Sequence, residues 1–376
     1  MSASDPIALF DPLGQYRRLK SEIDSRIAAV MAAGAYINGP EIAELESALA
    51  AHSGALHCVA VANGTDALVM ALAAEEIGPG DAVFVPAFTY VASAGAVRLA
   101  GATPVFVDVA LDSCNIDAED LERRIGAVKA EGALRPRAVM PVDLYGLPAD
   151  YPAVAAVAQA HGLTVVADAA QSFGGRRDGK GVGALAEITT TSFYPTKPLG
   201  CAGDGGAMFT DDAERAERWR VMRTHGTDAS RTAVMLGMNN RLDTLQAAIL
   251  LAKLPGLEAE RRRKDDLAAI YHRAFEGMVS PAPQAYGCDH AWALYTVRTP
   301  RRDALLHALR AEGVGAGIYY NAPVHLHPAY RSFGGGEGSL PNAERLADEV
   351  LSLPLHPELD DAQAERVCTA VIRALE

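Results

Sequence analysis

The sequence lacks an excess of positive charge and any long apolar run. Its 376 residues include 34 lysines and arginines against 47 aspartates and glutamates, which gives a formal net charge of −13. Because an acidic protein repels phosphate backbones and anionic lipid, we expect no nucleic acid and no membrane among its main partners. No stretch approaches the roughly 18 uninterrupted apolar residues of a membrane span, and the first residues lack a basic-then-apolar signal pattern. We therefore expect a cytoplasmic protein.

Cysteine is scarce as well. The five cysteines are widely spaced, form no CxxC pair and are joined by no histidine cluster. This pattern favours reduced thiols over a disulfide framework, and it offers no zinc site. His325 and His327, in the VHLHP segment, have no cluster of carboxylates or thiolates near them in the sequence. We therefore predict no metal site there either.

The composition is 49% hydrophobic and 22% charged, which is typical of a globular protein. From about residue 56 to residue 210, short β-branched runs alternate with helical stretches, the pattern of parallel strands joined by crossover helices. We predict an α/β fold with one large sheet of mixed but mostly parallel strands and helices on both faces. The predicted strands cover residues 58–62, 82–87, 103–109, 137–146, 163–170, 189–193 and 206–210.

The chain beyond residue 210 predicts a second, smaller α/β domain. Helices are expected at 212–224 and 242–276, the second broken at Pro255, since proline removes a backbone donor and clashes with the preceding turn. We place a large domain at 1–254, which includes an amphipathic helix over 41–52, and a small domain at 255–376. The small domain is predicted to contain strands at 292–299 and 314–320 and helices at 302–313, 343–353 and 361–375.

Asp168 and Lys197 are the first candidates for chemistry. Asp168 directly follows a fully apolar strand, so it lies at a carboxyl end, where open α/β sheets bind ligands. An aspartate at this place also serves as an ordinary cap of the next turn. Lys197 stands in a turn rich in proline and glycine, from which its side chain reaches inward or stays solvated. Pyridoxal phosphate explains both residues, because an amine holds it as a Schiff base and a carboxylate keeps its ring nitrogen protonated.

The same cofactor carries a phosphate, which binds at helix N-termini on backbone donors. Asn63-Gly64-Thr65-Asp66 joins a predicted strand to a predicted helix and supplies such a site, although the same pattern is typical of an ordinary N-cap. Gly64 lets the backbone approach the phosphate, and the Thr65 hydroxyl can bond to it. Ser192 is a second candidate phosphate ligand, and Phe88 is a candidate for stacking on the ring.

These residues are part of a wider resemblance. The chain resembles the DegT/StrS family of sugar aminotransferases, which are pyridoxal-phosphate enzymes of the aspartate-aminotransferase fold, fold type I. The resemblance implies a large cofactor-binding domain with a mixed sheet of the seven-stranded type, followed by a small C-terminal α/β domain. The matching segments extend over nearly the whole sequence: Gly39-Pro40-Glu41, Asn63-Gly64-Thr65-Asp66-Ala67-Leu68, Pro86-Ala87-Phe88-Thr89-Tyr90, Gly101-Ala102-Thr103-Pro104-Val105-Phe106-Val107-Asp108, Leu144-Tyr145-Gly146, Asp168-Ala169-Ala170-Gln171, Ser192-Phe193-Tyr194-Pro195-Thr196-Lys197-Pro198-Leu199-Gly200, Gly205-Gly206, Asn239-Asn240-Arg241-Leu242-Asp243 and Leu353-Pro354-Leu355-His356-Pro357.

Carried over to this sequence, the resemblance implies a role for each matching residue. Lys197 forms the internal aldimine with the cofactor, and Asp168 pairs with the pyridinium nitrogen. Gln171 lies near the phenolic oxygen, and Phe88 takes the ring-stacking place. The residues that the resemblance assigns to the phosphate are Gly64, Thr65, Ser192 and, from the partner subunit of a homodimer, Asn239. The active site then lies at the subunit interface, and a monomer is expected to be inactive.

The AAQSFG, SFYPTKPLGCAGDGGA and NRLDTLQAAILLAKL segments are most similar to the branch that aminates C3 of UDP-linked 3-oxo sugars, including 3-oxo-glucuronate derivatives. In that branch the arginine two places after the cofactor-binding asparagine contacts the substrate, which implies Arg241 here. A guanidinium suits a carboxylate or a phosphate. Tyr319 and Tyr320 stand where the branch has a His-Tyr pair, so the sugar itself stays open. We predict that Tyr319, Tyr320 and His325 line the sugar pocket.

The predicted reaction is a ping-pong transamination. Glutamate, or glutamine, gives its amino group to pyridoxal phosphate and leaves pyridoxamine phosphate, which then aminates a UDP- or dTDP-linked 3-oxo sugar. Such a step belongs to amino-sugar biosynthesis for a surface polysaccharide or a secondary metabolite. Three alternatives stay open: an aminotransferase for a non-nucleotide cyclic ketone, a sugar dehydratase that uses the same cofactor, and a regulatory protein on the same fold. Such dehydratases replace the lysine by histidine, whereas this sequence has Lys197.

Overall fold

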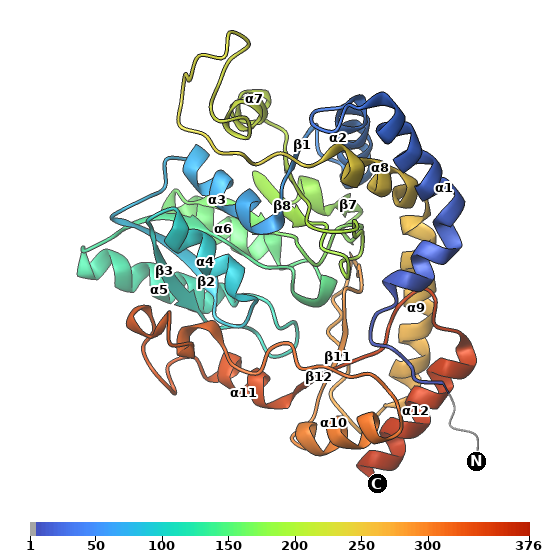
Figure 1. The fold of residues 1–376 in the computed structure, drawn as a ribbon. Coiled ribbons are helices and arrows are strands. Elements are labelled where there is room, and N and C mark those ends of the chain that lie inside the picture. Colours follow the sequence, from blue (N-terminus) through green and yellow to red (C-terminus); the bar gives the residue numbers. More distant parts are fainter. Residues whose placement is uncertain (1–4) are drawn as a thin grey trace.

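The computed structural model describes residues 5–376 of the chain. A sheet of seven strands forms its centre, and β1, β2, β3 and β8 are labelled in Figure 1. The order of its strands is β1-β9-β8-β5-β4-β2-β3. Neighbouring strands are parallel except at β9, which runs antiparallel to both β1 and β8. The predicted mixed, mostly parallel sheet is therefore confirmed. Its strands are β1 (His57–Val61), β2 (Asp81–Pro86), β3 (Thr103–Val107), β4 (Arg135–Val139), β5 (Thr164–Asp168), β8 (Ile188–Ser192) and β9 (Gly206–Thr210).

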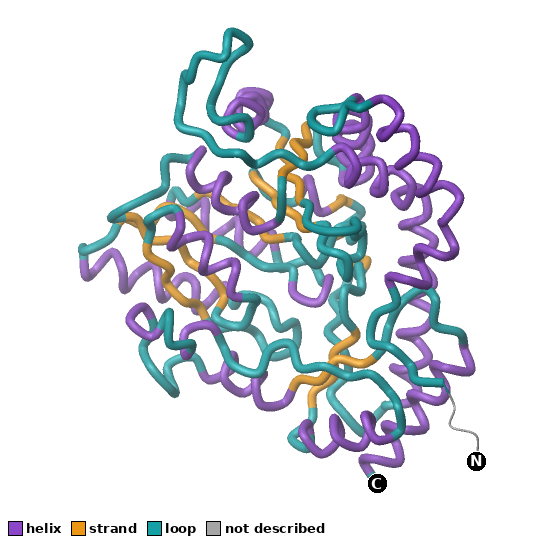
Figure 2. Tube along the Cα trace, viewed as in Figure 1, coloured by secondary structure: helices purple, strands orange, loops and turns teal. Residues whose placement is uncertain are grey.

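Helices cover both faces of this sheet. Because successive side chains of a strand point to opposite faces, β2 contributes to two cores. Val83 and Val85 pack with α3 (Gly64–Ala74), α4 (Val91–Leu99) and α7 (Ala213–Met222). Ala82 and Phe84 pack with α5 (Ala118–Glu131) and α6 (Tyr151–His161) on the other face. Figure 2 shows the strands in the interior, with helices around them.

A third group of helices covers the end of the sheet formed by β1 and β9. α2 (Pro40–Ser53) and α8 (Thr244–Lys253) share a core there, and α1 (Pro12–Ala33) lies along α8. The predicted break at Pro255 is confirmed, because α8 ends at Lys253 and α9 (Leu257–Ala274) follows after a short 3-10 turn. Among residues 5–376, no helix has both the length and the apolar character that crossing a bilayer requires.

The chain from α9 onward forms most of a second hydrophobic core. It lies between α9, α10 (Arg302–Ala311), α12 (Asp361–Leu375) and a two-stranded sheet of β11 (Tyr295–Arg298) and β12 (Val350–Leu353), and it also takes in Ile7. α11 (Pro341–Glu349) packs on the core of the large sheet instead. A small three-stranded sheet contains β6 (Arg176–Arg177), β7 (Lys180–Gly181) and β10 (Cys288–Asp289). The boundary between residues 254 and 255 stays a prediction.

Two predictions for this part are wrong. Residues 314–320 form only isolated bridges, from Val314 to Ile7 and from Gly317 to Ser352, instead of a strand. The reason is that the segment divides its pairing between two neighbours: the Gly315 N–H donates to the Ile7 carbonyl, and Gly317 exchanges two hydrogen bonds with Ser352, so neither pairing forms a continuous ladder. The end of the helix predicted over 343–353 is the fully buried strand β12, which pairs with β11.

Candidate functional site

A cavity of about 470 Å³ opens at the carboxyl ends of the central strands. Three segments meet there: the end of β5, the end of β8, and the turn from β1 into α3. Ligands of open α/β sheets bind at this edge, so the topology of the sheet determines the location. The predicted site residues that line the cavity are Gly64, Thr65, Asp168, Gln171, Ser192, Lys197, Tyr319 and Tyr320.

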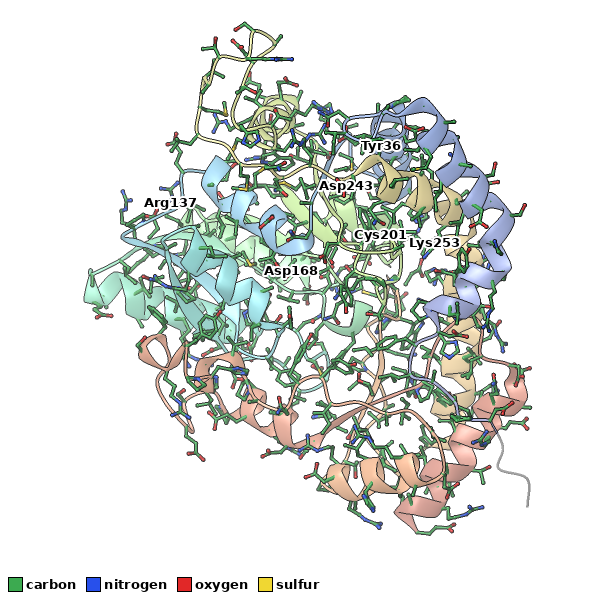
Figure 3. All side chains as sticks on the ribbon, viewed as in Figure 1. Tyr36, Arg137, Asp168, Cys201, Asp243 and Lys253 are labelled. Carbon is green, nitrogen blue, oxygen red and sulfur yellow. The ribbon has the colours of Figure 1, made fainter. Side chains whose placement is uncertain are left out.

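Asp168 is the last residue of β5 and lies in the interior, only 5% exposed (Figure 3). Its Oδ2 accepts a hydrogen bond from Ser93 Oγ at 2.7 Å, and its Oδ1 accepts one from the Ala170 N–H at 3.2 Å. Burial raises the pKa of this carboxyl, and the two hydrogen bonds and Lys197 oppose the rise. A cationic ring nitrogen in the cavity would further favour the ionised carboxylate.

Lys197 lies in the loop between β8 and β9, where its N–H donates to the Tyr194 carbonyl at 2.8 Å. Within residues 5–376, no group accepts a hydrogen bond from its Nζ. Burial lowers the pKa of this amine, and the nearby Asp168 carboxylate partly offsets the effect. A lowered pKa leaves more of the amine in its neutral, nucleophilic form.

The turn from β1 into α3 lies very close to the end of β8. Asn63 Oδ1 accepts a hydrogen bond from the Asp66 N–H at 2.8 Å and so caps the helix. A Cβ on Gly64 would lie 2.8 Å from Ser192 Cβ, so a larger residue would separate the turn from the end of β8. Gly64 and Thr65 therefore place the first amides of α3 at the cavity, next to the Ser192 hydroxyl, where an anion binds favourably.

Gln171 and two tyrosines form another wall. Gln171 Oε1 accepts a hydrogen bond from the Tyr145 N–H at 2.7 Å, and its Nε2 donates to the Tyr320 hydroxyl at 3.3 Å. These two bonds fix which end of the amide is the donor. Burial raises the pKa of the Tyr320 hydroxyl, which keeps it protonated. Tyr319 lies beside it on the same wall.

Four predicted residues do not line this cavity. Phe88 is 1% exposed and packs in the core, with its ring centroid 6.3 Å from that of Tyr320. His325 is fully buried elsewhere, with its Nε2 3.2 Å from Glu344 Oε1. Asn239 is exposed and Arg241 is partly buried, on the segment between α7 and α8. The roles predicted for these four residues stay predictions.

The structure adds residues that the sequence did not reveal. Ser93, on α4, is fully buried and holds Asp168, yet a serine in a small-residue helix carries no signal of this kind. Asn240 Oδ1 accepts a hydrogen bond from the Ala62 N–H at 3.0 Å, just before the turn into α3. Tyr90 and Tyr194 line the cavity while remaining 55% and 53% exposed. Both residues belong to segments that carry the family resemblance, and only the fold shows that they face the cavity.

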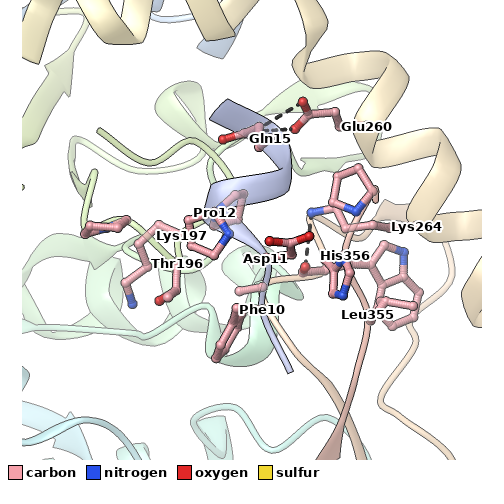
Figure 4. Close-up of a pocket in the computed structure, with 15 residues that line it drawn as sticks. Phe10, Asp11, Pro12, Gln15, Thr196, Lys197, Glu260, Lys264, Leu355 and His356 are labelled. Carbon is pink, nitrogen blue, oxygen red and sulfur yellow. Dashed lines mark hydrogen bonds between the residues drawn. The ribbon is translucent and has the colours of Figure 1, made fainter. Parts of the chain in front are cut away.

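A smaller pocket of about 60 Å³ lies behind Lys197. Lys197 and Lys264 both line it, on opposite sides of Pro12 (Figure 4). Lys264 Nζ donates to the carbonyls of Ala291 and Trp292 at 2.6 and 3.1 Å. Burial lowers the pKa of Lys264 to about 8. Because of these two hydrogen bonds, the Lys264 amine is engaged by main-chain carbonyls.

The donor set of the larger cavity fits pyridoxal phosphate. The cofactor requires an amine for its aldehyde, a carboxylate for its ring nitrogen and an anion site for its phosphate. Lys197 Nζ, the buried Asp168 carboxylate and the turn at Gly64 offer these three groups around one space. Lys197 Nζ in particular has no competing partner within the described chain.

Comparison with known proteins gives a consistent result. The model of the DegT/DnrJ/EryC1/StrS aminotransferase family matches residues 17–372. The chain is 42% identical to the UDP-2-acetamido-2-deoxy-3-oxo-D-glucuronate aminotransferase of Pseudomonas aeruginosa, over 97% of this chain and 99% of that protein. It is 43% identical to the dTDP-3-amino-3,4,6-trideoxy-alpha-D-glucose transaminase of Streptomyces venezuelae, over 97% and 95% of the two chains. The crystal structure of S. venezuelae DesV in complex with a ketimine intermediate matches with a TM-score of 0.95 and 42% identity, over 99% of each chain.

Proposed function

Because the chain belongs to the DegT/DnrJ/EryC1/StrS aminotransferase family, we propose that it transfers an amino group from glutamate to a UDP- or dTDP-linked 3-oxo sugar. It is an aminotransferase, and its cofactor is pyridoxal 5′-phosphate. The observation that carries the proposal is Lys197 Nζ, a partly buried amine without a hydrogen-bond partner in the described chain, in one cavity with the buried Asp168. The substrate class follows from relatives that share about two-fifths of their residues with this chain over nearly its full length.

The cofactor, when bound, supplies an aldehyde carbon that accepts the amino group and a protonated ring that withdraws electrons from the donor's α-carbon. Lys197 would hold the aldehyde carbon, and Asp168 the ring nitrogen. The amides of Gly64 and Thr65 and the hydroxyl of Ser192 would hold the phosphate.

Lys197 Nζ has two tasks in this proposal. It would hold the aldehyde carbon of the cofactor, and it would be a free amine once glutamate has taken that place. Nζ would then act as the general base that accepts the α-proton of glutamate and as the general acid that returns a proton. Its lowered pKa increases the fraction of free base that can accept this proton. In the second half-reaction the same amine would move a proton in the opposite direction, to the sugar carbon that receives the amino group.

Asp168 would keep the ring nitrogen of the bound cofactor protonated. The residue is 5% exposed, so water competes little for its carboxylate. Ser93 Oγ and the Ala170 N–H hold it in place at 2.7 and 3.2 Å. An ion pair formed in this buried setting is stronger than one in water, which favours the electron-accepting form of the ring.

The proposed enzyme is a homodimer whose sites take residues from both subunits. Within residues 5–376, Lys197 is the only cationic side chain on the cavity wall, although a nucleotide sugar brings two phosphate groups. Asn239 and Arg241 follow a loop that exposes Val234 and Leu236, by 56% and 94%. Because exposed apolar clusters mark interaction sites, we propose that a second copy covers this loop. Asn239 and Arg241 would then reach the cofactor phosphate and the substrate of that copy.

A spectroscopic titration tests the proposal. Purified protein loaded with pyridoxal phosphate is expected to show a visible absorption band, which glutamate removes. A panel of UDP- and dTDP-linked 3-amino sugars is then added to the pyridoxal form, so that the second half-reaction runs backwards. The matching compound is expected to remove the band in the same way, with formation of the 3-oxo sugar.

Two outcomes contradict the proposal. If glutamine removes the band and glutamate does not, the donor is wrong. If glutamate removes it but no nucleotide-linked amino sugar does, whereas an amino-cyclitol does, the enzyme acts on a non-nucleotide cyclic ketone.

A further inference from the structure

The Leu144-Tyr145-Gly146 segment has no part in the mechanism above, yet it contacts several walls of the cavity. It forms a short turn after β4, in which Tyr145 is fully buried and adopts a φ of 60°, an unfavourable value for a residue with a side chain. Asn115 braces this turn from both ends. Its Oδ1 accepts a hydrogen bond from the Leu144 N–H at 3.0 Å, and its Nδ2 donates to the Leu147 carbonyl at 2.9 Å.

Tyr145 bonds to three separate segments. Its N–H donates to Gln171 Oε1 at 2.7 Å, and its carbonyl accepts from the Ala293 N–H at 2.9 Å. Its hydroxyl donates to the carbonyl of Tyr319. Gln171 and Tyr319 line the main cavity, and Ala293 lines the adjoining space next to Lys197. One buried residue thus joins the cofactor side of the cavity to the wall that comes from the C-terminal part of the chain.

Gly146 allows this arrangement. It has a φ of 102°, and a Cβ there would lie 2.8 Å from Trp292 N and 2.9 Å from both Ala293 N and Gln171 O. No other residue fits so close to three main-chain atoms. The position of the turn against Gln171 and residues 292–293 is therefore fixed by the backbone, and the Tyr145 hydroxyl adds the bond to residue 319.

We propose that Tyr145 is a positioning residue for the sugar nucleotide, which acts by holding the Tyr319-Tyr320 wall at the distance that the substrate requires. The proposal rests on the proposed function, since it assigns that wall to the sugar nucleotide. The hydroxyl serves the Tyr319-Tyr320 side and the main-chain N–H serves Gln171. Removal of the hydroxyl alone therefore weakens sugar binding and leaves the glutamate half-reaction intact.

The test compares Tyr145→Phe with Tyr271→Phe. Tyr271 is also fully buried and donates to a main-chain carbonyl, that of Pro354 at 2.8 Å, but it lies in the second core. We expect Tyr145→Phe to raise the Kd for a UDP-linked 3-amino-3-deoxy sugar about five- to tenfold, the effect of one buried hydrogen bond. The rate with glutamate and the visible band should stay unchanged. Tyr271→Phe should change none of these.

Hydrogen exchange on the cofactor-free protein provides a readout that does not depend on activity. Amides of residues 315–322 should exchange faster in Tyr145→Phe than in the parent or in Tyr271→Phe. The proposal is overturned if exchange of these amides is unchanged in Tyr145→Phe. It is also overturned if Tyr145→Phe impairs the reactions with glutamate and with the amino sugar equally, or if Tyr145→Phe and Tyr271→Phe have the same effects. If the parent protein does not react with any nucleotide-linked sugar, the proposed function fails, and the exchange experiment still decides whether Tyr145 holds the wall.

Discussion

Lys197 and Lys264 line the same small pocket, and burial lowers the pKa of both amines. Lys264 Nζ donates to two main-chain carbonyls and so braces residues 291–292. Lys197 Nζ has no such partner among the residues that the structure describes, and it shares the main cavity with Asp168. The difference teaches that burial alone does not identify a reactive lysine. The separating feature is the presence or absence of an acceptor for its protons.

Asp143 and Asp168, at the carboxyl edge of the sheet, differ in the same way, by how fully protein donors occupy their side chains. The Asp143 N–H donates to the Asp168 carbonyl at 3.1 Å, so the residues are neighbours. The Asp143 carboxylate is fully buried and accepts from the Ala149 N–H, the Tyr151 hydroxyl and the Ser172 hydroxyl, at 2.8, 2.9 and 2.6 Å. Asp168 has fewer donors and lines the cavity. Asp143 therefore shapes the loop, and Asp168 is available to a ligand.

The largest expected effect distinguishes Lys197 from Lys264 by the rate of the glutamate half-reaction. Lys197→Ala should reduce the rate of the glutamate half-reaction by about a thousandfold or more, because it removes the group that moves the proton. Lys264→Met should retain the half-reaction and the visible band. Stopped-flow absorbance with pyridoxal phosphate supplied to both variants measures the rates. Retained turnover in Lys197→Ala would sink the assignment.

The next effect separates the two aspartates. Asp168→Asn should slow the half-reaction by about a hundredfold, since a neutral amide does not stabilise a protonated ring nitrogen. Asp143→Asn keeps the shape and most hydrogen bonds of the loop, so it should retain turnover and serves as the matched control. Equal losses in the two variants would show that the effect comes from the loop and not from the cofactor.

A pH effect follows from Asp143. Burial raises its pKa from 3.8 to about 6, so the folded protein binds a proton more tightly than the unfolded chain does. Its contribution to the free energy of unfolding is full below about pH 4 and is lost as the pH rises through about 6, with a size of about 3 kcal/mol. The thermal midpoint of the cofactor-free parent should therefore fall relative to that of Asp143→Asn across this range. A constant difference between the two midpoints would contradict the shift.

The smallest effect concerns stability at Lys264. Lys264→Met leaves the carbonyls of Ala291 and Trp292 without their donor, which should lower the free energy of unfolding by about 1 to 3 kcal/mol. Lys197→Ala breaks no hydrogen bond of its side chain in the described structure, so its unfolding in the absence of cofactor should change less. Urea unfolding of the two cofactor-free variants makes the comparison. A larger loss of unfolding free energy in Lys197→Ala than in Lys264→Met would contradict the structural role assigned to Lys264.

Much of the fold could be predicted because each signal was local. The alternation of short apolar runs and helical stretches gave the large sheet, and β9 occupies the predicted residues 206–210. Pro255 marked the break between α8 and α9. Residues 314–320 were misassigned because they pair in part with Ile7 and in part with Ser352, and no local pattern reports that two distant segments share the pairing.

The site shows the same limit. Asp168, Lys197 and Gly64 stand at strand ends or turns, where residue type and position suggest a ligand, and the structure places them around one cavity. Ser93 and Tyr145 act through side-chain and main-chain hydrogen bonds across the fold. Their importance depends on the residues that they meet in three dimensions, which the sequence order does not contain.

Covalent trapping tests the central contrast most directly. The protein is loaded with pyridoxal phosphate, treated with borohydride, and digested for mass mapping of the three buried or partly buried lysines Lys197, Lys253 and Lys264. The account predicts the reduced pyridoxyl group on Lys197 alone, because Lys253 and Lys264 donate to main-chain carbonyls. A label on Lys253 or Lys264, or an unlabelled Lys197, would contradict it.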